Sequence, residues 1–388
     1  MKIVFVSNYY NHHQSALSES LAKCDDVEYT FIETEQMEQE RKALGWGMEQ
    51  YPDFIKRSYI SEQSMRECLE LINAADVVIH GSAPEMFLKK RLKEGKLTFK
   101  YSERIYKEGF KHWQQPLRVI KNYARGWSKK NHYLLCASAY TYADFSKTFN
   151  FHNRAYKWGY FPAVKEYENF ESIMTNKQSA SILWVARLIE WKHPDASIRV
   201  AERLRNDGYR FKLNLIGSGV MAQEIGQSIR DKGLTDCVKM LGAMKPEQVR
   251  EHMEKAEIFL FTSDFNEGWG AVLNESMNSG CAVVASHAIG SVPFLIRDGV
   301  NGLIYKNGDI DDLYDKVKYL LDNPEKRMEI GRQAYKTLKE EWNAENAAHR
   351  FLKIVKAIQS GNPHPDLYTD GPCSKAEKLK NNWYKKNE

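Results

Sequence analysis

Two glutamates around a glycine-containing loop have the spacing and chemistry to bind a polyhydroxyl ligand. Glu267 lies in the run Thr262–Val284 (TSDFNEGWGAVLNESMNSGCAVV), and Glu275 follows it by eight residues. The pattern predicts a strand that ends at Thr262, a loop that carries Glu267, and a helix that begins near Ala271 and carries Glu275. A carboxylate can accept hydrogen bonds from two neighbouring hydroxyl groups, such as those of a sugar or a ribose.

The loop between these two acids also suits an anion. Gly268 and Gly270 lack a side chain, so the backbone there can approach a ligand closely. The helix start that we expect near Ala271 presents backbone N–H groups to a negative charge. A loop acid and a surface-helix acid without a common role are the alternative. The order of strand, glycine-containing loop and helix favours a binding site.

Two cations follow another expected strand. Arg187 and Lys192 lie in the run Trp184–Pro194 (WVARLIEWKHP). An arginine and a lysine at the end of a strand can hold a diphosphate. Considered alone, the pair is better explained as part of a solvated surface, because exposed Arg and Lys residues are common.

A third candidate for ligand binding is the turn in Leu215–Met221 (LIGSGVM), which contains Gly217 and Gly219. Position 222 is alanine, so the turn lacks the G-x-G-x-x-G spacing and is a weak sign of dinucleotide binding. A nicotinamide-dependent dehydrogenase would need that motif and a ribose-binding acid about 20 residues further on. Neither half of the chain offers both.

Short apolar strands alternate with amphipathic helices throughout the chain, which predicts parallel sheets covered by helices. A first series precedes residue 162, and a second begins near Ser181. The segment Glu33–Ile60 is polar and is expected to be irregular. The expected strands are Lys2–Ser7, Val27–Ile32, Asp76–His80, Leu97–Lys100, Tyr133–Ala137, Ala155–Tyr160, Ser181–Val185, Lys212–Ile216, Val238–Leu241, Ile258–Thr262, Ala282–Ser286 and Gly302–Tyr305.

A chain of 388 residues is too long for one ordinary core, so we expect two domains. Two such sheets leave a cleft between the carboxyl ends of their strands, where ligands bind. We predict a first Rossmann-like domain at 1–162, a linker at 163–178, a second Rossmann-like domain at 179–343, a helix at 344–360, and a polar basic tail at 361–388.

Five motifs occur in order over about residues 180–305: VARLIEWKHP, LIGSG, LGAMKPEQV, SDFNEGWGAVLNESMNSGCAVVAS and GSVPFLIRDGVNGLIY. Together they resemble the retaining glycosyltransferases of family 4 type, the glycosyl transferases group 1. The resemblance implies an α/β GT-B fold, in which two Rossmann-like domains face each other across a cleft. The first domain would bind the acceptor and the second the nucleotide sugar. The C-terminal helix Ala344–Gln359 would cross back to the first domain.

The same resemblance implies a hexosyltransferase that retains the anomeric configuration. It would move a sugar from a UDP- or GDP-linked donor to a hydroxyl of a glycan or lipid-linked acceptor, in the biosynthesis of capsule, lipopolysaccharide or another surface polysaccharide. Glu267 would contact the donor sugar, Glu275 the ribose, and Arg187 with Lys192 the diphosphate. The remaining donor-binding residues implied are Gly217, Met244, Gly268, Trp269, Gly270, Ala271 and Val272.

The N-terminal half departs from the family pattern. Many relatives have a Gly-Gly pair after the first strand, where this chain has Asn8–His13 (NYYNHH). Many also carry a His after the fourth strand, where Thr98–Glu103 (TFKYSE) has none. The nearest candidates there are His80, Lys100, Glu103 and Arg104, and on the acceptor side we predict His13, His80 and Arg104. A metal cluster formed by His12, His13 and His80, and an exposed His13 without a role, are the alternatives.

We predict a reaction without a metal or another cofactor. Arg187 and Lys192 can neutralise the charge of a departing diphosphate. The only D-x-D sequence, Asp309-Ile310-Asp311, opens an expected helix, so capping explains its acids better than metal binding.

Positive charge is concentrated in one part of the chain. The net charge is +5, but Lys89–Lys130 holds fourteen Lys or Arg residues against three acids, with aromatic residues between them. This mixture favours an anionic membrane surface or a lipid-linked phosphate. Nucleic acid and a plain solvated face are the alternatives, and we predict no nucleic-acid partner.

Two further features bear on location and role. No stretch of about 18 apolar residues occurs, and the six cysteines are scattered, which predicts a cytoplasmic protein, peripheral at the inner face of the membrane. A non-catalytic partner of another transferase, with an intact donor pocket, is the alternative function. The altered first domain keeps that alternative open.

Overall fold

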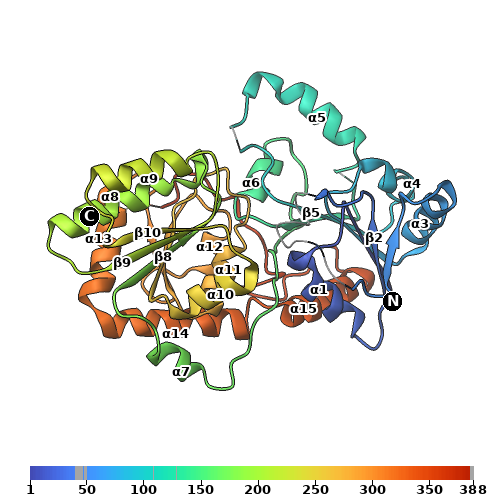
Figure 1. Ribbon diagram of the computed structural model, residues 1–388. Coiled ribbons are helices and arrows are strands. Elements are labelled where there is room, and N and C mark those ends of the chain that lie inside the picture. The colour runs from blue at the N-terminus through green and yellow to red at the C-terminus, as the bar shows by residue number, and fades with distance from the viewer. Residues whose placement is uncertain (40–46, 48–49, 108, 128, 385–388) are drawn as a thin grey trace. The chain divides into compact units, whose positions relative to one another are not determined.

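The computed structural model describes residues 1–39, 47, 50–107, 109–127 and 129–384 (Figure 1). These residues form two compact units. The first unit contains Met1–Ala163 and Trp342–Lys380, and the second contains Val164–Glu341 and the residues from Asn381 onward. Within the part of the chain that the structure describes, no helix has both the length and the apolar character needed to cross a membrane.

The first unit is built on a seven-stranded parallel sheet in the order β3-β2-β1-β4-β5-β6-β7. Central strand β1 pairs with β2 and β4 in parallel, with Ile3 opposite Tyr29 and Val77. Apolar residues on both faces of β1 are buried, as expected for a parallel sheet covered by helices. The strands are β1 Lys2–Ser7, β2 Glu28–Glu33, β3 Ile55–Arg57, β4 Val77–His80, β5 Thr98–Ser102, β6 His132–Cys136 and β7 Ala155–Lys157.

Alternate residues of these strands pack against helices on opposite faces. Val4 and Val78 join a cluster with Ile72 of α3, whereas Phe99 points to the other face and contacts Phe351 of α15 with ring centroids 4.9 Å apart. The helix predicted at 344–360 thus belongs to the first unit. The helices of this unit are α1 His12–Ala22, α3 Glu62–Ala74, η1 Glu85–Leu88, α4 Lys89–Lys93, η2 His112–Gln114, α5 Gln115–Ala124, α6 Thr141–Ser146 and α15 Ala344–Gln359.

The expectation that Glu33–Ile60 is irregular is wrong for its last part, although residues 40–46, 48 and 49 lie outside the described residues. Strand β3 lies in this segment and pairs with β2 through Phe31 and Ile55. Three residues are too short for a clear alternating pattern. The strand is fixed by tertiary contacts instead, since Arg57 Nε donates to the buried Glu33 carboxylate at 2.9 Å.

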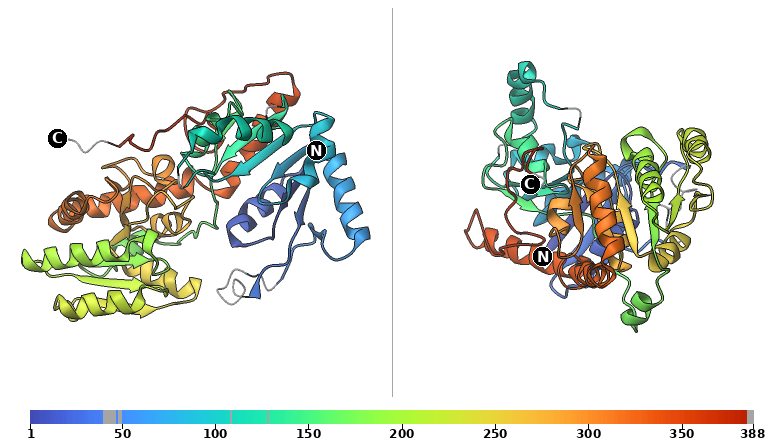
Figure 2. Two further views of the ribbon diagram at one scale, coloured as in Figure 1. Left: turned by 90° about the horizontal axis from the view of Figure 1, so that it is seen from above. Right: turned by 90° about the vertical axis from the view of Figure 1, so that its left-hand side faces the viewer.

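The second unit is built on a six-stranded parallel sheet in the order β10-β9-β8-β11-β12-β13 (Figure 2). Its strands are β8 Ser181–Val185, β9 Lys212–Ile216, β10 Val238–Gly242, β11 Ile258–Phe261, β12 Ala282–Ser286 and β13 Leu303–Tyr305. Its helices are α7 Phe170–Thr175, η3 Glu190–Lys192, α8 Pro194–Asn206, α9 Ala222–Asp231, α10 Pro246–Lys255, α11 Val272–Asn278, α12 Val292–Leu295, α13 Ile310–Asp322 and α14 Pro324–Glu340.

Helix α13 shows how local sequence sets the ends of these elements. Asp309 is its N-cap, and the Asp309 carboxylate accepts a hydrogen bond from the backbone N–H of Asp312 at 3.0 Å. Asp311 forms an ion pair with Arg203 of α8. The capping interpretation of this D-x-D sequence is therefore confirmed.

Residues predicted as a linker, 163–178, lie almost entirely in the second unit and contain α7. Lys177 ties this segment to the ends of two helices. Its ammonium group donates to the carbonyls of Ala256 at 2.8 Å and Ser279 at 2.9 Å, and also reaches those of Met253 and Glu254. Burial lowers the pKa of Lys177, and the surrounding oxygens replace the lost water.

The tail after α15 packs against strand β7. Cys373 and Ala376 donate backbone hydrogen bonds to Lys157 and Ala155 of β7, and Lys157 donates to Ser374. Tyr156 Oη donates to the Pro365 carbonyl at 3.0 Å. These bonds cover the outer edge of β7, which would otherwise expose unpaired backbone groups.

Replacing Lys177 with Met should lower the free energy of unfolding by about 3 kcal/mol, because the carbonyls it caps lose a charged donor. Urea unfolding followed by circular dichroism would measure the loss. Lys336→Met on α14 is the control, since that side chain is 60% exposed and should change stability by no more than about 0.5 kcal/mol. Equal effects of the two substitutions would contradict the anchoring role.

Candidate functional site

The loops after β8 and β11 lie side by side because the two strands are neighbours in the sheet. From β8 the chain winds outward through β9 to β10, and then returns to β11 on the other side of β8. Such a reversal of strand order is where parallel sheets bind ligands, outside the carboxyl ends of the strands. Arg187 and Lys192 follow β8, and Glu267 follows β11.

Hydrogen bonds join these two loops directly. The backbone N–H of Asp264 donates to the carbonyl of Trp191 at 3.0 Å, and Thr262 Oγ1 donates to the carbonyl of Lys192 at 2.6 Å. The buried Trp184 indole N–H donates in turn to Thr262 Oγ1 at 2.8 Å. These two hydrogen bonds run from the buried Trp184 side chain through Thr262, and they hold the Lys192 backbone next to the end of β11.

The structure brings Lys192 and Glu267 into contact. The Lys192 ammonium forms an ion pair with Glu267 Oε2, and the two side chains are only 12% and 10% exposed. Ser263 Oγ donates to the same carboxylate oxygen at 2.9 Å. The Lys192 ammonium also lies 4.3 Å from the ring centre of Trp191. A cation and an anion are thus held at one place, with their geometry set by neighbours.

Arg187 is exposed at the start of the same loop. Among the described residues it makes no ion pair, so its guanidinium is available to an anionic ligand. Leu188 beside it donates its backbone N–H to Ser218 at 2.9 Å, which fixes the loop against the turn after β9.

The glycines of that turn are required by close packing. A Cβ on Gly217 would lie 1.9 Å from the Ala186 carbonyl oxygen, and one on Gly219 would lie 2.3 Å from the Leu188 oxygen. Both glycines also have positive φ angles. Gly217 therefore allows the Arg187 loop to pack closely against this turn. This packing explains the glycine whether or not Gly217 contacts a donor, as predicted.

The loop that carries Glu267 is held in a similar way. Gly270 has a φ of +82°, and a Cβ there would lie 2.4 Å from the Phe261 ring. Gly268 is buried, and the Trp269 side chain is fully buried with its indole N–H donating to Asn274 at 2.9 Å. Of Trp269, only the backbone is left to face a ligand.

Glu275 lies in the first turn of α11, which begins at Val272 with Ala271 as its N-cap. The Glu275 side chain is half-buried, and burial raises its pKa while nearby Arg250 opposes the shift. Within the part of the chain that the structure describes, Glu275 makes no ion pair with Lys192 or Arg187. Met244, partly buried, lies in the loop between β10 and α10.

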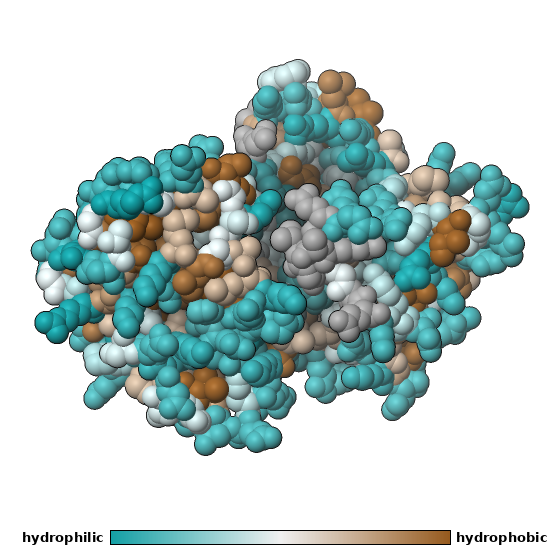
Figure 3. Space-filling model, in the orientation of Figure 1, coloured by the Kyte–Doolittle hydropathy of each residue, from teal (hydrophilic) through white to brown (hydrophobic). Residues whose placement is uncertain are grey.

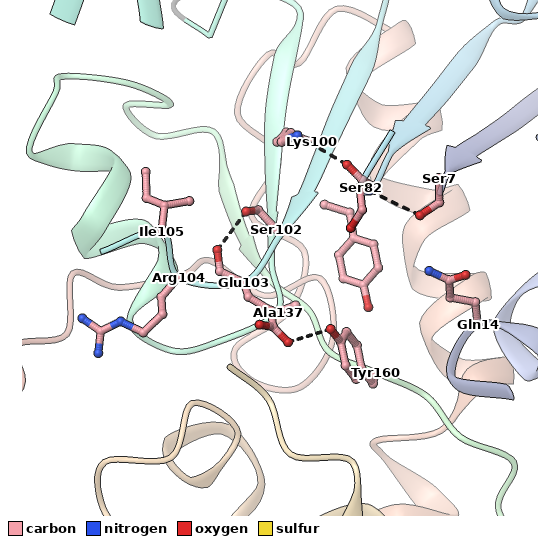
Figure 4. A pocket seen from close by; sticks show the side chains of 12 residues that line it. Ser7, Gln14, Ser82, Lys100, Ser102, Glu103, Arg104, Ile105, Ala137 and Tyr160 are labelled. Atoms are coloured by element: carbon pink, nitrogen blue, oxygen red, sulfur yellow. Dashed lines mark hydrogen bonds between the residues drawn. The ribbon is translucent and has the colours of Figure 1, made fainter. Parts of the chain in front are cut away.

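A second polar site lies at the carboxyl edge of the first sheet. The order of its strands reverses between β1 and β4, and a cavity of about 300 Å³ lies there (Figure 4). Hydroxyl groups, an amide, a carboxylate and an ammonium group line it. The lining residues are Ser7, Gln14, Gly81, Ser82, Lys100, Tyr101, Ser102, Glu103, Arg104, Ile105, Ala137 and Tyr160.

Lys100 and Glu103 are the charged groups with the clearest geometry in this pocket. The Lys100 ammonium lies 3.6 Å from Glu85 and 3.1 Å from His80 Nδ1, and burial lowers its pKa. Tyr160 Oη donates to Glu103 Oε1 at 2.6 Å. Lys100 and Glu103 are thereby held in position by other residues of the first unit.

His80 corrects one expectation, because its side chain is fully buried and does not line the pocket. Its Nε2 lies 2.8 Å from the Ala83 carbonyl, which can only accept, so Nε2 carries the proton. Nδ1 then accepts from Lys100. Burial and Lys100 lower the pKa of His80 well below its usual value, so the ring is neutral and supports Lys100.

The other two residues predicted on the acceptor side lie at or near this pocket. Arg104 lines it, but its guanidinium is 3.4 Å from buried Asp144 and is held there over the Tyr140 ring. His13 stacks on Tyr160 with ring centroids 5.5 Å apart. Burial and the neighbouring His12 lower the pKa of His13 to about 3.

The metal-cluster alternative finds no support in these positions. In the described ranges, no three His, Cys, Asp or Glu side chains are arranged to hold a metal ion. Sequence reasoning missed the hydroxyl groups of Ser7, Ser82 and Ser102. A signal was present, since each lies at or just after the carboxyl end of a buried strand.

The second unit matches a known family. Residues 166–337 match the model of the "Glycosyl transferases group 1". The amylovoran biosynthesis glycosyltransferase AmsK of Erwinia amylovora is 29% identical over 186 residues, which are 47% of this chain and 46% of AmsK. A Campylobacter jejuni protein is 31% identical over 173 residues, which are 45% of this chain and 43% of that protein. Its name is N-acetylgalactosamine-N,N'-diacetylbacillosaminyl-diphospho-undecaprenol 4-alpha-N-acetylgalactosaminyltransferase. The matched region spans less than half the length of these relatives.

The fold match extends over both units. The crystal structure of Anabaena Alr3699/HepE in complex with UDP superposes with a TM-score of 0.66 and 15% identity, and covers 93% of this chain and all of that one. The chain therefore has the two-unit α/β GT-B fold, and within its second unit residues 166–337 are similar to the glycosyl transferases group 1 family.

Proposed function

We propose that this chain is a retaining, metal-independent glycosyltransferase. It moves a hexosyl group from a UDP- or GDP-linked donor to a hydroxyl of a glycan or lipid-linked acceptor in surface polysaccharide assembly. The observation that carries the proposal is the Lys192–Glu267 ion pair beside exposed Arg187, at the strand reversal of a unit that matches the group 1 family.

Each group in the second unit has a role in donor chemistry. Glu267 accepts hydrogen bonds from the donor sugar, and Glu275 accepts them from the ribose. Arg187 and Lys192 bind the diphosphate. The bond between the anomeric carbon and the phosphate oxygen breaks with its electrons going to that oxygen, and the two cations stabilise the new charge. The departing oxygen then receives the proton of the acceptor hydroxyl, which attacks from the same face.

The pocket of the first unit suits a polyhydroxyl acceptor. Lys100 and Glu103 offer one donor and one acceptor of fixed position, and the serine hydroxyls around them can do either. Two relatives support the class of acceptor. The name of the Campylobacter protein includes a diphospho-undecaprenol substrate, and the Erwinia protein takes part in amylovoran biosynthesis. A lipid-linked acceptor also agrees with the basic residues between 89 and 130 and with action at the inner face of a membrane.

Replacing Arg187 or Lys192 with Ala should lower turnover by about 10²–10³-fold, because each removes a preorganised donor to the leaving diphosphate. Binding of UDP and GDP, measured by calorimetry, should weaken in parallel. Arg199→Ala is the matched control, since Arg199 is exposed on α8 and forms its ion pair with Asp195 of the same helix. Wild-type rates in both site variants would remove the diphosphate assignment.

A chelator should leave the rate unchanged, because Arg187 and Lys192 supply the positive charge that a divalent ion would otherwise provide. Slow hydrolysis of the nucleotide sugar, followed with and without EDTA, tests this. A rate that falls with EDTA and returns with Mg²⁺ or Mn²⁺ would reject metal independence. Nucleotide binding with no hydrolysis or transfer at all would favour the non-catalytic alternative.

Replacing Glu103 with Gln should raise the KM for the acceptor about tenfold, since a charged hydrogen bond contributes on the order of 1.5 kcal/mol. Hydrolysis of the donor without acceptor should be unchanged, because Glu103 belongs to the first unit. Glu94→Gln provides the control, as Glu94 lies outside the pocket and pairs with Lys96. An unchanged acceptor KM would show that the acceptor binds elsewhere.

A further inference from the structure

Helix α5 presents an apolar stripe to solvent. Trp113, Leu117, Ile120 and Tyr123 are 74%, 68%, 67% and 72% exposed. Trp113 lies in η2, directly before α5, and the other three lie in α5, where at about 100° per residue they fall on one side of the helix. Figure 3 shows a brown, hydrophobic patch beside teal, hydrophilic side chains at the top of the view, where α5 lies in Figure 1. Side chains of this size are rarely left in water together, because each has apolar area to bury.

The opposite side of α5 is the one that attaches to the first unit. Asn122 is 4% exposed, and its Nδ2 donates to Thr148 Oγ1 at 2.9 Å. Gln115 Nε2 donates to the Lys147 carbonyl at 2.7 Å. The polar side of the helix is therefore inside and the apolar side outside, which reverses the usual pattern of a surface helix. Figure 1 shows α5 projecting from the sheet of its unit.

Basic residues line one flank of the apolar stripe. Arg118, Lys121 and Arg125 follow one another on the same side of α5, and the helix contains no acid. The Arg118 guanidinium lies over the Tyr106 ring at 4.6 Å, and that of Arg125 over the Trp127 ring at 5.1 Å. These contacts hold the two cations beside the stripe.

We propose that α5 lies on an anionic lipid bilayer, with its apolar stripe among the acyl chains and its basic flank on the headgroups. The inference deepens the proposed function, on which it rests for the presence of a lipid-linked acceptor. Apolar side chains and cations along one helix suit a surface that has an apolar layer beneath a negative one. Nucleic acid offers no apolar layer to bury Leu117 and Ile120, so the stripe favours lipid.

Flotation of the full-length protein with vesicles tests the proposal. One set contains phosphatidylcholine alone, and the other contains roughly one third phosphatidylglycerol. The wild-type chain should bind the anionic vesicles, and more weakly as salt is raised, because salt screens the basic flank. Lys121→Gln should weaken this binding about fivefold, which corresponds to about 1 kcal/mol. The double variant Leu117→Ser, Ile120→Ser should weaken it by at least about tenfold.

Matched controls separate the stripe from general surface properties. Tyr319→Ser removes an exposed aromatic residue from α13, and Lys353→Gln removes an exposed lysine from α15. Both should bind vesicles like the wild type. Donor hydrolysis without vesicles should be equal in all variants, so failure of the proposed function would appear there and not in the flotation.

Three results would overturn the assignment. One is wild-type vesicle binding by the double variant. Another is equal binding to neutral and anionic vesicles. The third is a wild-type dimer that the double variant converts to a monomer without any change in vesicle binding, because a second copy of the chain would then cover the stripe.

Discussion

The contact between Lys192 and Glu267 is the interaction on which the candidate donor site depends. Two charges that are almost buried carry a large desolvation cost, which their attraction offsets only when the geometry is well fixed. The hydrogen bonds from Trp184 through Thr262 to the Lys192 backbone supply that fixed geometry. Each charge stabilises the other before a ligand arrives. In the proposed function, a diphosphate would then pair with Lys192 and sugar hydroxyls would bind Glu267, with little movement of the backbone.

Close packing between the loop after β8 and the turn after β9 fixes the geometry of the candidate site in the second unit. The Ala186 and Leu188 carbonyls approach Gly217 and Gly219 so closely that any Cβ would collide with backbone. A side chain at either position would push the Arg187 loop away from the turn after β9. The glycines therefore act through packing, and their position next to Arg187 and Lys192 is a consequence of strand order.

Prediction from sequence worked best where structure follows from local pattern. The apolar strands Ser181–Val185 and Lys212–Ile216 and the helix Ala344–Gln359 have the predicted ends, and the group 1 motifs lie within the residues that match the group 1 model. Prediction failed where contacts between residues far apart in the sequence determine the structure. Strand β3 is held by pairing with β2 and by contact with Glu33. His80 is buried by residues that pack around it. The local sequence around either one does not show these contacts. Which side of α5 faces outward also depends on Thr148 and Lys147, far along the chain from the stripe.

The two units reach a binding site by the same topology but with different chemistry. Each sheet reverses its strand order once, and each places its polar side chains at the carboxyl ends of the strands beside the reversal. In the second unit those side chains are Arg, Lys and Glu on glycine-containing loops, which suits a sugar diphosphate. In the first they are serine hydroxyls around Lys100 and Glu103, which suits neutral hydroxyl groups. A donor with a phosphate needs cations whatever sugar it carries, whereas an acceptor pocket must match one set of hydroxyls. Under the proposed function, the first unit should therefore differ more from relatives than the second, and the group 1 model matches residues 166–337, which lie in the second unit.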